Sequence, residues 1–128
     1  NLKPGELITA ITCAMSTACG FYAVKEKQSF DWPLVFCCVA LDMDGPVIRK
    51  ASVCAGAVAP IPWRLTKVEA ALAGVDPKDD AALRKACAEA TAGAKPMSGN
   101  AYKTQLLPVA VRRAVLRAMG MPFEEGTP

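Results

Sequence analysis

With 128 residues, of which 52% are hydrophobic, the chain has enough sequence for one sizeable core and too little for two. Its net charge of +3 is too small for a nucleic-acid-binding surface, which usually gathers basic residues on one face. The longest apolar run, residues 34–41, is far shorter than the about 20 residues that a membrane-spanning helix needs. We therefore expect one domain that binds neither nucleic acid nor membrane.

The first part of the chain predicts extended structure. Residues 6–12 carry isoleucines, leucine and threonines after a Pro4-Gly5 turn, which favours an entering strand or arm. Residues 21–28 mix aromatic with charged side chains, as a partly exposed strand does. The amino terminus has no basic region followed by a long apolar stretch and a cleavage site, so we expect no secretion.

A β-hairpin is the clearest local signal. The two β-rich runs 34–41 and 47–58 flank the sequence Asp-Met-Asp-Gly at 42–45, in which glycine supplies the positive φ that a tight turn requires. The first run is apolar on both of its faces, which predicts a central strand with cover on both sides. Arg49 and Lys50 make the second strand more one-sided.

After residue 62 the apolar period changes from two to about 3.6 residues, which predicts helices. We expect them at residues 66–73, 79–91 and 101–119. Asp79 and its neighbouring aspartates cap the second helix, because carboxylates accept the free amides of a first turn. Pro108 has no amide to donate and predicts a kink in the third helix.

This order of elements determines the expected fold. Strands come first and helices follow, without β-α-β alternation, which predicts an α+β fold: an antiparallel sheet of three to four strands with about three helices packed on one face. We expect the domain to span residues 1–121 and residues 122–128 to form a flexible tail.

The six cysteines lie mostly in apolar segments, where cysteine behaves as a small hydrophobe. We expect Cys37, Cys38 and Cys54 to be core residues of the hairpin and the thiols to stay reduced in a cytoplasmic setting. Adjacent strand residues point to opposite faces, so no metal site is expected at the cysteine pair 37–38. Histidine is absent from the sequence, which excludes Ser-His and Cys-His catalysis.

Phosphate-binding loops are also missing, since the sequence has neither GxGxxG nor a P-loop lysine motif. The chain therefore has no evident way to hold a dinucleotide alone. Lys25 and Lys27 are interleaved with Phe21, Tyr22 and Phe30, which fits a strand that faces a ligand. A lysine-rich strand edge that discourages aggregation predicts the same pattern.

Three stretches, taken in order, resemble one known family. The first is an aromatic and basic segment before Phe-Asp and an apolar strand, the second a hairpin with a Gly-Gly-Val-Ala-Pro-x-Pro-x-Arg corner, and the third a Tyr-Arg-x-x-Leu helix with paired arginines. The first stretch is FYAVKEKQSFDWPLV at 21–35. The second comprises ALD at 40–42, Gly45 with VIR at 47–49, and GAVAPIPWR at 56–64, which precedes Glu69, Leu72 and Gly74. The third is YKTQLLPVAVRRA at 102–114. Together they resemble the carbon monoxide dehydrogenase flavoprotein carboxy-terminal domain.

The resemblance implies a place in the FAD-binding medium subunit of a molybdenum hydroxylase, of the xanthine, aldehyde or carbon monoxide dehydrogenase type. In that family the domain follows an FAD-binding region and helps to relay electrons from molybdopterin and iron-sulfur clusters to an acceptor. We expect FAD to be held mainly by an amino-terminal domain absent from this chain. The implied partners are that domain and the iron-sulfur and molybdopterin subunits, and no activity is expected from this chain alone.

We expect Tyr22, Lys25 and Lys27 to contact the cofactor that the resemblance implies. Lys27 stands at the family's second basic position, and Lys25 substitutes for the lysine that is missing at position 24. An aromatic ring and two ammonium groups suit a flat ring and negative phosphates, through stacking and charge-assisted hydrogen bonds. We expect this segment to lie at a sheet margin and to reach beyond the core.

Three positions depart from the family pattern. Val24 stands where the family commonly has a lysine two positions after the aromatic residue, Ala57 replaces the second glycine of the corner, and Lys103 replaces the arginine after Tyr102.

Two other functions stay open. A stand-alone structural or protein-interaction domain without flavin would be distinguished by its gene neighbourhood. An enzyme that uses a reactive thiol, such as Cys13 or Cys19, would be distinguished by thiol alkylation with activity profiling.

Overall fold

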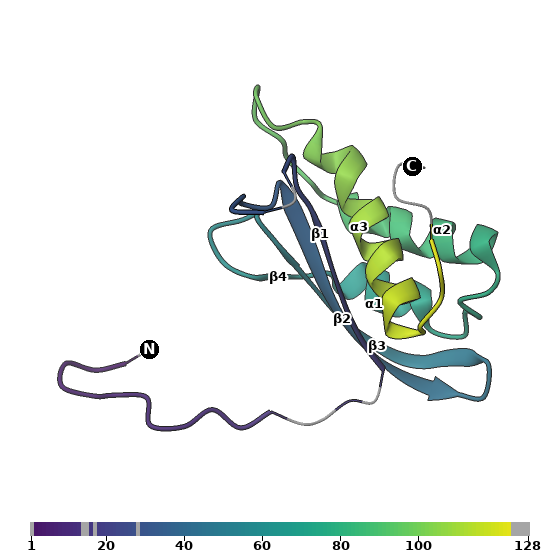
Figure 1. The fold of residues 1–128 in the computed structure, drawn as a ribbon, viewed down its shortest axis with the longest axis horizontal. Helices are drawn as coiled ribbons and strands as arrows, with labels where there is room; N and C mark the ends of the chain where they lie inside the picture. The colour runs from purple at the N-terminus through teal and green to yellow at the C-terminus, as the bar shows by residue number, and fades with distance from the viewer. Residues whose placement is uncertain (1, 14–15, 17, 28, 124–128) are drawn as a thin grey trace.

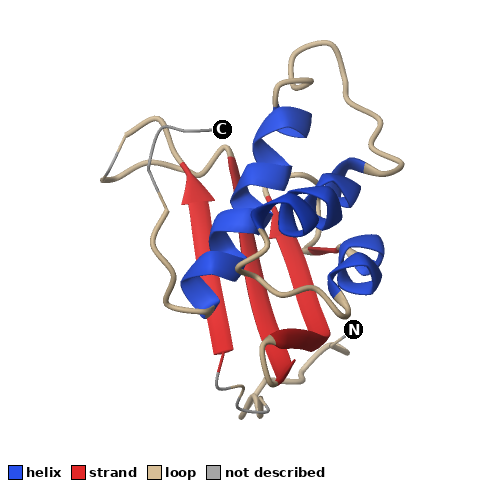
Figure 2. Cartoon of the chain, turned by 90° about the vertical axis from the view of Figure 1, so that its right-hand side faces the viewer, coloured by secondary structure: helices blue, strands red, loops and turns tan. Residues whose placement is uncertain are grey.

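The structure, a computed structural model, describes residues 2–13, 16, 18–27 and 29–123. These residues form an α+β fold in which an antiparallel sheet carries helices on one face (Figure 1, Figure 2). The fold class expected from the sequence is confirmed. In the described part of the chain, none of the helices combines the length and the apolar character that crossing a bilayer requires.

The sheet contains four strands in chain order. β1 (Ala18–Val24) pairs with β2 (Val35–Asp44), β2 pairs with β3 (Val47–Gly56), and the short β4 (Trp63–Arg64) pairs with β3 at the far edge. The predicted Asp-Gly turn joins β2 and β3, and Gly45 adopts a positive φ of 56° there.

The described residues form three α-helices after the strands. They are α1 (Thr66–Leu72), α2 (Asp80–Ala88), which continues into the 3-10 turn η1 (Glu89–Thr91), and α3 (Lys103–Ala118). The side chain of Asp79 accepts an amide hydrogen of the first turn of α2 at 3.0 Å, so the predicted cap is confirmed. Pro108 lies inside α3, at the position where the sequence predicts a kink.

In the part of the chain that the structure describes, the helices cover only one face of the sheet. In Figure 2 the helices lie together in front of the sheet, with α3 along β1 and β2. Alternate β2 side chains point toward these helices and are buried: Val35, Cys37, Val39 and Leu41. The expectation that β2 is covered on both sides is therefore wrong in this structure, because the described helices all pack against the same face.

The cysteines of the hairpin divide between the two faces for the same reason. Cys37 is buried, as expected, whereas Cys38 is exposed and Cys54 is half-buried. The expectation that all three belong to the core is wrong for Cys38 and Cys54. An apolar sequence does not distinguish a strand with two covered faces from a strand with one covered face and small apolar side chains on the other.

Strand β4 was not predicted, because two residues carry no periodic pattern. It is held by Glu69 on α1, whose Oε1 accepts from Arg64 Nε at 2.8 Å and from the Val53 amide at 2.9 Å. The Arg64 guanidinium, helped by the Val53 amide, holds the pKa of Glu69 below its usual range against the opposing effect of burial. One carboxylate therefore joins β3, β4 and α1.

Helix α3 approaches β1 so closely that only glycine fits at the contact. A Cβ atom placed on Gly20 would lie 2.0 Å from the carbonyl oxygen of Ala114 and 2.7 Å from the amide nitrogen of Ala118. The absence of a side chain at position 20 lets the helix lie directly on the strand backbone.

Residues 2–13 form an arm that extends away from the sheet and the helices (Figure 1). Residues 6–12 adopt no regular strand, and their large apolar side chains are open to solvent, with Leu7 86% and Ile11 80% exposed. Of the two expectations for this segment, the structure shows the arm.

Candidate functional site

Two loops and the start of a helix lie together at one end of the sheet, opposite the β2–β3 turn. In the antiparallel register Val24 pairs with Val35, and Gly56 pairs with Phe36. The β1–β2 loop (25–34), the β3–β4 loop (57–62) and the start of α3 therefore lie at the same end. We call this the loop end of the domain.

The β1–β2 loop, which carries the predicted lysines, is held by one aspartate. Asp31 Oδ2 accepts from the backbone amides of Glu26 at 3.0 Å and Lys27 at 2.9 Å. The amide of Leu34 donates to the Val24 carbonyl oxygen at 2.8 Å and closes the base of the loop. The backbone of the lysine segment is thus fixed by local hydrogen bonds rather than by burial.

Exposed basic and aromatic side chains follow from this loop geometry. Lys25 and Lys27 are both exposed, and so are Phe30 and Trp32, the latter by 90%. Phe30 adopts a φ of 52°, a backbone angle that residues other than glycine rarely take. Two ammonium groups and two aromatic rings are therefore displayed on one short loop, a combination that suits an aromatic anion or a partner surface.

Tyr22 lies elsewhere than the sequence indicated. Strand β1 is an edge strand, as expected, but the ring of Tyr22 is only 8% exposed and faces α3. Its hydroxyl accepts from Arg113 Nη1 at 2.7 Å, and the guanidinium of Arg117 lies 4.9 Å from the ring centroid. The expectation that Tyr22 reaches beyond the core is wrong, because side chains from α3 cover it.

Phe123 completes the cover of Tyr22. The two rings meet edge to face with their centroids 5.5 Å apart. The first residues of the predicted tail therefore pack on the domain, whereas residues 124–128 lie outside the described part of the chain.

The β3–β4 loop begins at a strained residue that α3 holds in place. Ala57 has a φ of 62°, and its carbonyl oxygen accepts from Lys103 Nζ at 2.6 Å. Ala57 and Lys103 are two of the departures from the family pattern, and the structure brings them together. The positive φ explains why glycine suits position 57, since a Cβ is disfavoured in this conformation.

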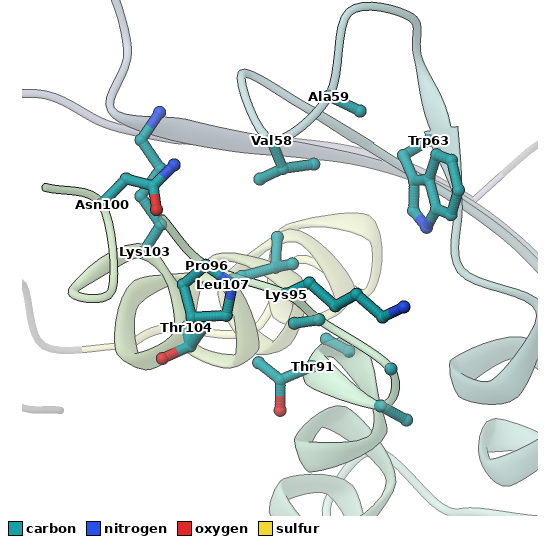
Figure 3. Close-up of a pocket in the computed structure, with 14 residues that line it drawn as sticks. Val58, Ala59, Trp63, Thr91, Lys95, Pro96, Asn100, Lys103, Thr104 and Leu107 are labelled. Carbon is teal, nitrogen blue, oxygen red and sulfur yellow. The ribbon is translucent and has the colours of Figure 1, made fainter. Parts of the chain in front are cut away.

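A cavity of about 300 Å³ lies beneath this loop (Figure 3). In the close-up, Trp63 and Lys95 lie on one side, and Asn100 and Lys103 lie on the other. The other walls are mostly small and apolar, from Val58, Ala59, residues 90–94, Pro96, Thr104 and Leu107.

Among the residues that the structure describes, no three of the metal-binding side chain types come close enough to hold an ion. The sequence analysis did not predict a role for Asp31. Its signal is an aspartate in a short loop between two strands, where the carboxylate can accept hydrogen bonds from nearby backbone amides.

Comparison with protein families identifies one match over most of the chain. Residues 20–118 match the model of the CO dehydrogenase flavoprotein C-terminal domain. The match includes β1, the hairpin, the loop end and α3, but not the arm. A comparison with curated proteins gave no match.

Solved structures with this fold include two CO dehydrogenases. The reconstituted CO dehydrogenase from Oligotropha carboxidovorans is similar with 30% identity and a TM-score of 0.70, over 82% of this chain and 37% of that chain. CO dehydrogenase from Hydrogenophaga pseudoflava, in a form that lacks the Mo-pyranopterin moiety, is similar with 27% identity and a TM-score of 0.68, over 84% of this chain and 39% of that chain.

A third structure shares the fold at lower identity. Quinoline 2-oxidoreductase from Pseudomonas putida 86 has 22% identity and a TM-score of 0.72, over 83% of this chain and 38% of that chain. The aligned region therefore corresponds to well under two thirds of each of these longer chains.

Proposed function

This chain belongs to the family of CO dehydrogenase flavoprotein C-terminal domains, and on that premise we propose that it completes the FAD-carrying subunit of a molybdenum hydroxylase. In this role the loop end covers part of a flavin that is held mainly by a preceding domain. The bound FAD supplies the electron-transfer chemistry, and the protein positions it.

The residues of the loop end fit a limited contact with FAD. Among the described residues, no glycine-rich loop cradles a pyrophosphate, so this chain alone lacks the means to enclose the cofactor. Lys25 and Lys27 nevertheless present two ammonium groups beside backbone amides of Glu26 and Lys27 that Asp31 already holds. Ordering before binding lowers the entropy cost of the contact.

The observation that carries the proposal is this Asp31 clamp. A lysine edge that serves only to prevent strand pairing needs charge but no fixed loop geometry. A cofactor contact needs both, because the ammonium groups must meet particular oxygen atoms. Of the three residues expected at the cofactor, the two lysines make the contact in our proposal, and Tyr22 supports it by anchoring β1 against α3 through Arg113.

The arm and the exposed aromatic residues fit a larger assembly. Leu7, Ile8 and Ile11 are large apolar side chains without cover in the domain, and Trp32 is similarly open at the loop end. Exposed apolar groups of this size usually mark contact surfaces. We assign the arm to the contact with the FAD-binding domain and the loop end to the side that faces the flavin and the iron-sulfur and molybdopterin subunits, in the cytoplasm.

The clamp is tested by Asp31→Ala in the assembled flavoprotein, with Asp44→Ala as the matched control. Asp44 is an exposed strand-end aspartate next to the β2–β3 turn, at the opposite end of the sheet. We expect Asp31→Ala to lower FAD retention during gel filtration while Asp44→Ala leaves it unchanged. Equal FAD retention in the two variants, with both melting normally, would remove the support for a preorganised cofactor contact.

A further inference from the structure

The uncovered face of the sheet carries a group of thiols. Cys19, Cys38 and Cys54 line one shallow hollow together with Phe21 and Arg64. The three come from three different strands, β1, β2 and β3. Half of the cysteines in the sequence therefore open onto the same surface.

Two of these thiols are direct cross-strand neighbours. Cys38 on β2 is the register partner of Cys54 on β3. Their strand neighbours Cys37 and Ala55 are buried against the helices, so both thiols point to the uncovered face. Burial raises the pKa of Cys38, and so does the neighbouring thiol of Cys54, so oxidation near neutral pH proceeds through a small thiolate fraction.

The backbone hydrogen bonds show which kind of pair this is. Val53 donates its amide to Glu69 Oε1 and accepts with its carbonyl from Leu65, so both groups point away from β2. The next pair along the strands, Cys38 and Cys54, is therefore hydrogen-bonded, with an expected Cα separation of about 5.5 Å. This Cα separation lies within the range of disulfides, about 4.4–6.8 Å. The Cβ atoms of a hydrogen-bonded pair are about 5.5 Å apart, roughly 1 Å more than a disulfide prefers, so a bridge requires both strands to move slightly toward each other.

Cys19 is less well placed. It pairs with Ala40, which makes it a diagonal neighbour of Cys38, and such diagonals are about 7–8 Å apart between Cα atoms. Its thiol also donates to the carbonyl oxygen of Ser16 at 3.5 Å. The geometry selects the pair Cys38–Cys54 over Cys19–Cys38.

We propose that Cys38 and Cys54 form a dithiol modification site, which a hydroperoxide oxidises reversibly to an intrachain disulfide on the uncovered face of the sheet. This inference does not depend on the proposed flavoprotein function. Because Cys38 is exposed and Cys54 is half-buried, a disulfide between them belongs to the labile kind that small thiols reduce readily.

The reaction balances with hydrogen peroxide as the oxidant. The sulfur of Cys38, the more exposed of the two, attacks one peroxide oxygen, the O–O bond breaks, and a sulfenic acid and water form. Cys54 sulfur then attacks the sulfenic sulfur, the S–O bond breaks, the S–S bond forms, and a second water leaves. Two thiols lose two electrons and two protons, and the peroxide takes them up.

The first test measures whether the two sulfurs can be bridged at all. Phenylarsine oxide condenses with two neighbouring thiols and releases one water, without oxidation. We expect one bridging phenylarsenic group per native chain, mapped by mass spectrometry to Cys38 and Cys54. Cys38→Ser and Cys54→Ser should each abolish the bridge, and Cys19→Ser and Cys13→Ser should retain it.

The second test follows oxidation of the same native chain. Dilute hydrogen peroxide should lower the intact mass by two hydrogens and produce a Cys38–Cys54 cross-linked peptide that dithiothreitol reverses. Cys38→Ala and Cys54→Ala, with circular dichroism to verify folding, should prevent this cross-link. A Cys19–Cys38 disulfide, a bridge that survives in Cys54→Ser, or oxidation that stops at sulfinic acids without cross-linking would overturn the proposal.

Discussion

Arg113 and Tyr22, which are 91 residues apart in sequence, are joined by a buried hydrogen bond of 2.7 Å between the guanidinium and the phenol. Arg113 is itself buried on α3, and its guanidinium carbon lies 5.1 Å from the centroid of the Tyr22 ring. The contact fixes the position of β1 against α3 and therefore the base of the lysine loop. It also explains why an aromatic residue that stands close to the lysine loop in sequence belongs to the core.

We expect Tyr22→Phe to lower the free energy of unfolding by about 1–3 kcal/mol, because a buried charged donor loses a partner while the packing volume stays nearly the same. Urea denaturation followed by circular dichroism measures the change. Tyr102→Phe is the control, since Tyr102 is 43% exposed and should change stability by less than about 0.5 kcal/mol. Equal effects of the two substitutions would contradict the importance of the buried bond.

Gly20→Ala should destabilise the domain by about 1–3 kcal/mol or more, because the new methyl group would overlap the Ala114 carbonyl oxygen. The matched control is Gly99→Ala, where a Cβ would meet nothing within 4 Å. The midpoints of thermal unfolding should fall for Gly20→Ala and stay close to the parent for Gly99→Ala. A normal midpoint for Gly20→Ala would mean that α3 lies farther from β1 than the structure shows.

Glu69 allows a test with two graded substitutions. Glu69→Gln keeps an acceptor for the Val53 amide but removes the charge opposite the exposed Arg64, so we expect a loss of about 0.5–1 kcal/mol. Glu69→Ala also leaves the Val53 amide without this acceptor and should cost about 1–3 kcal/mol.

The pH dependence of this ion pair has a defined sign. Because the folded pKa of Glu69 is lowered, its contribution is fully present above the unfolded value of about 4.3 and is lost as the pH falls through the folded value. The stability difference between the parent and Glu69→Gln should therefore be constant near neutral pH and shrink in acid. A difference that grows on acidification would show that the Arg64 contact does not stabilise the carboxylate.

Native-state alkylation should separate the cysteines into two classes. Burial raises the pKa of Cys87 to about 12 and also raises that of Cys37, so both thiols should resist iodoacetamide until the protein unfolds. Cys13 and Cys38 are exposed and should react in the native protein. Mass spectrometry of peptides after a short pulse of reagent measures the order, and early labelling of Cys37 would contradict the packing of β2.

The hairpin and the helix cap were predictable because their causes are local. Gly45 at a turn and Asp79 before a helix act on backbone groups within four residues. The strand alternation of β2 likewise predicted that Cys37 and Cys38 point to opposite faces. Local patterns of this kind carry most of the fold.

The features that escaped prediction depend on contacts between distant segments. Tyr22 is buried because three residues near the other end of the chain pack against it: Arg113, Arg117 and Phe123. Strand β4 is held in place by Glu69, and a strand of two residues is too short to show a periodic pattern in the sequence. Which side of β2 stays open is decided by where the helices pack, which the apolar run itself does not encode.

In our proposal the loop end contacts FAD. The double substitution Lys25→Ala with Lys27→Ala in the assembled flavoprotein tests this contact most directly. The matched control is Lys50→Ala with Lys78→Ala, which removes the same charge near the β2–β3 turn, at the opposite end of the sheet.

The measurement is the FAD dissociation constant by fluorescence titration, with the melting temperature recorded for each variant. Since each charge-assisted bond contributes about 1.5–3 kcal/mol, we expect the Lys25 and Lys27 variant to bind FAD at least about tenfold more weakly with a normal melting temperature. The control variant should bind FAD like the parent. An unchanged dissociation constant in the Lys25 and Lys27 variant, with impaired solubility as its only defect, would contradict the cofactor contact and support an edge strand guarded by lysines.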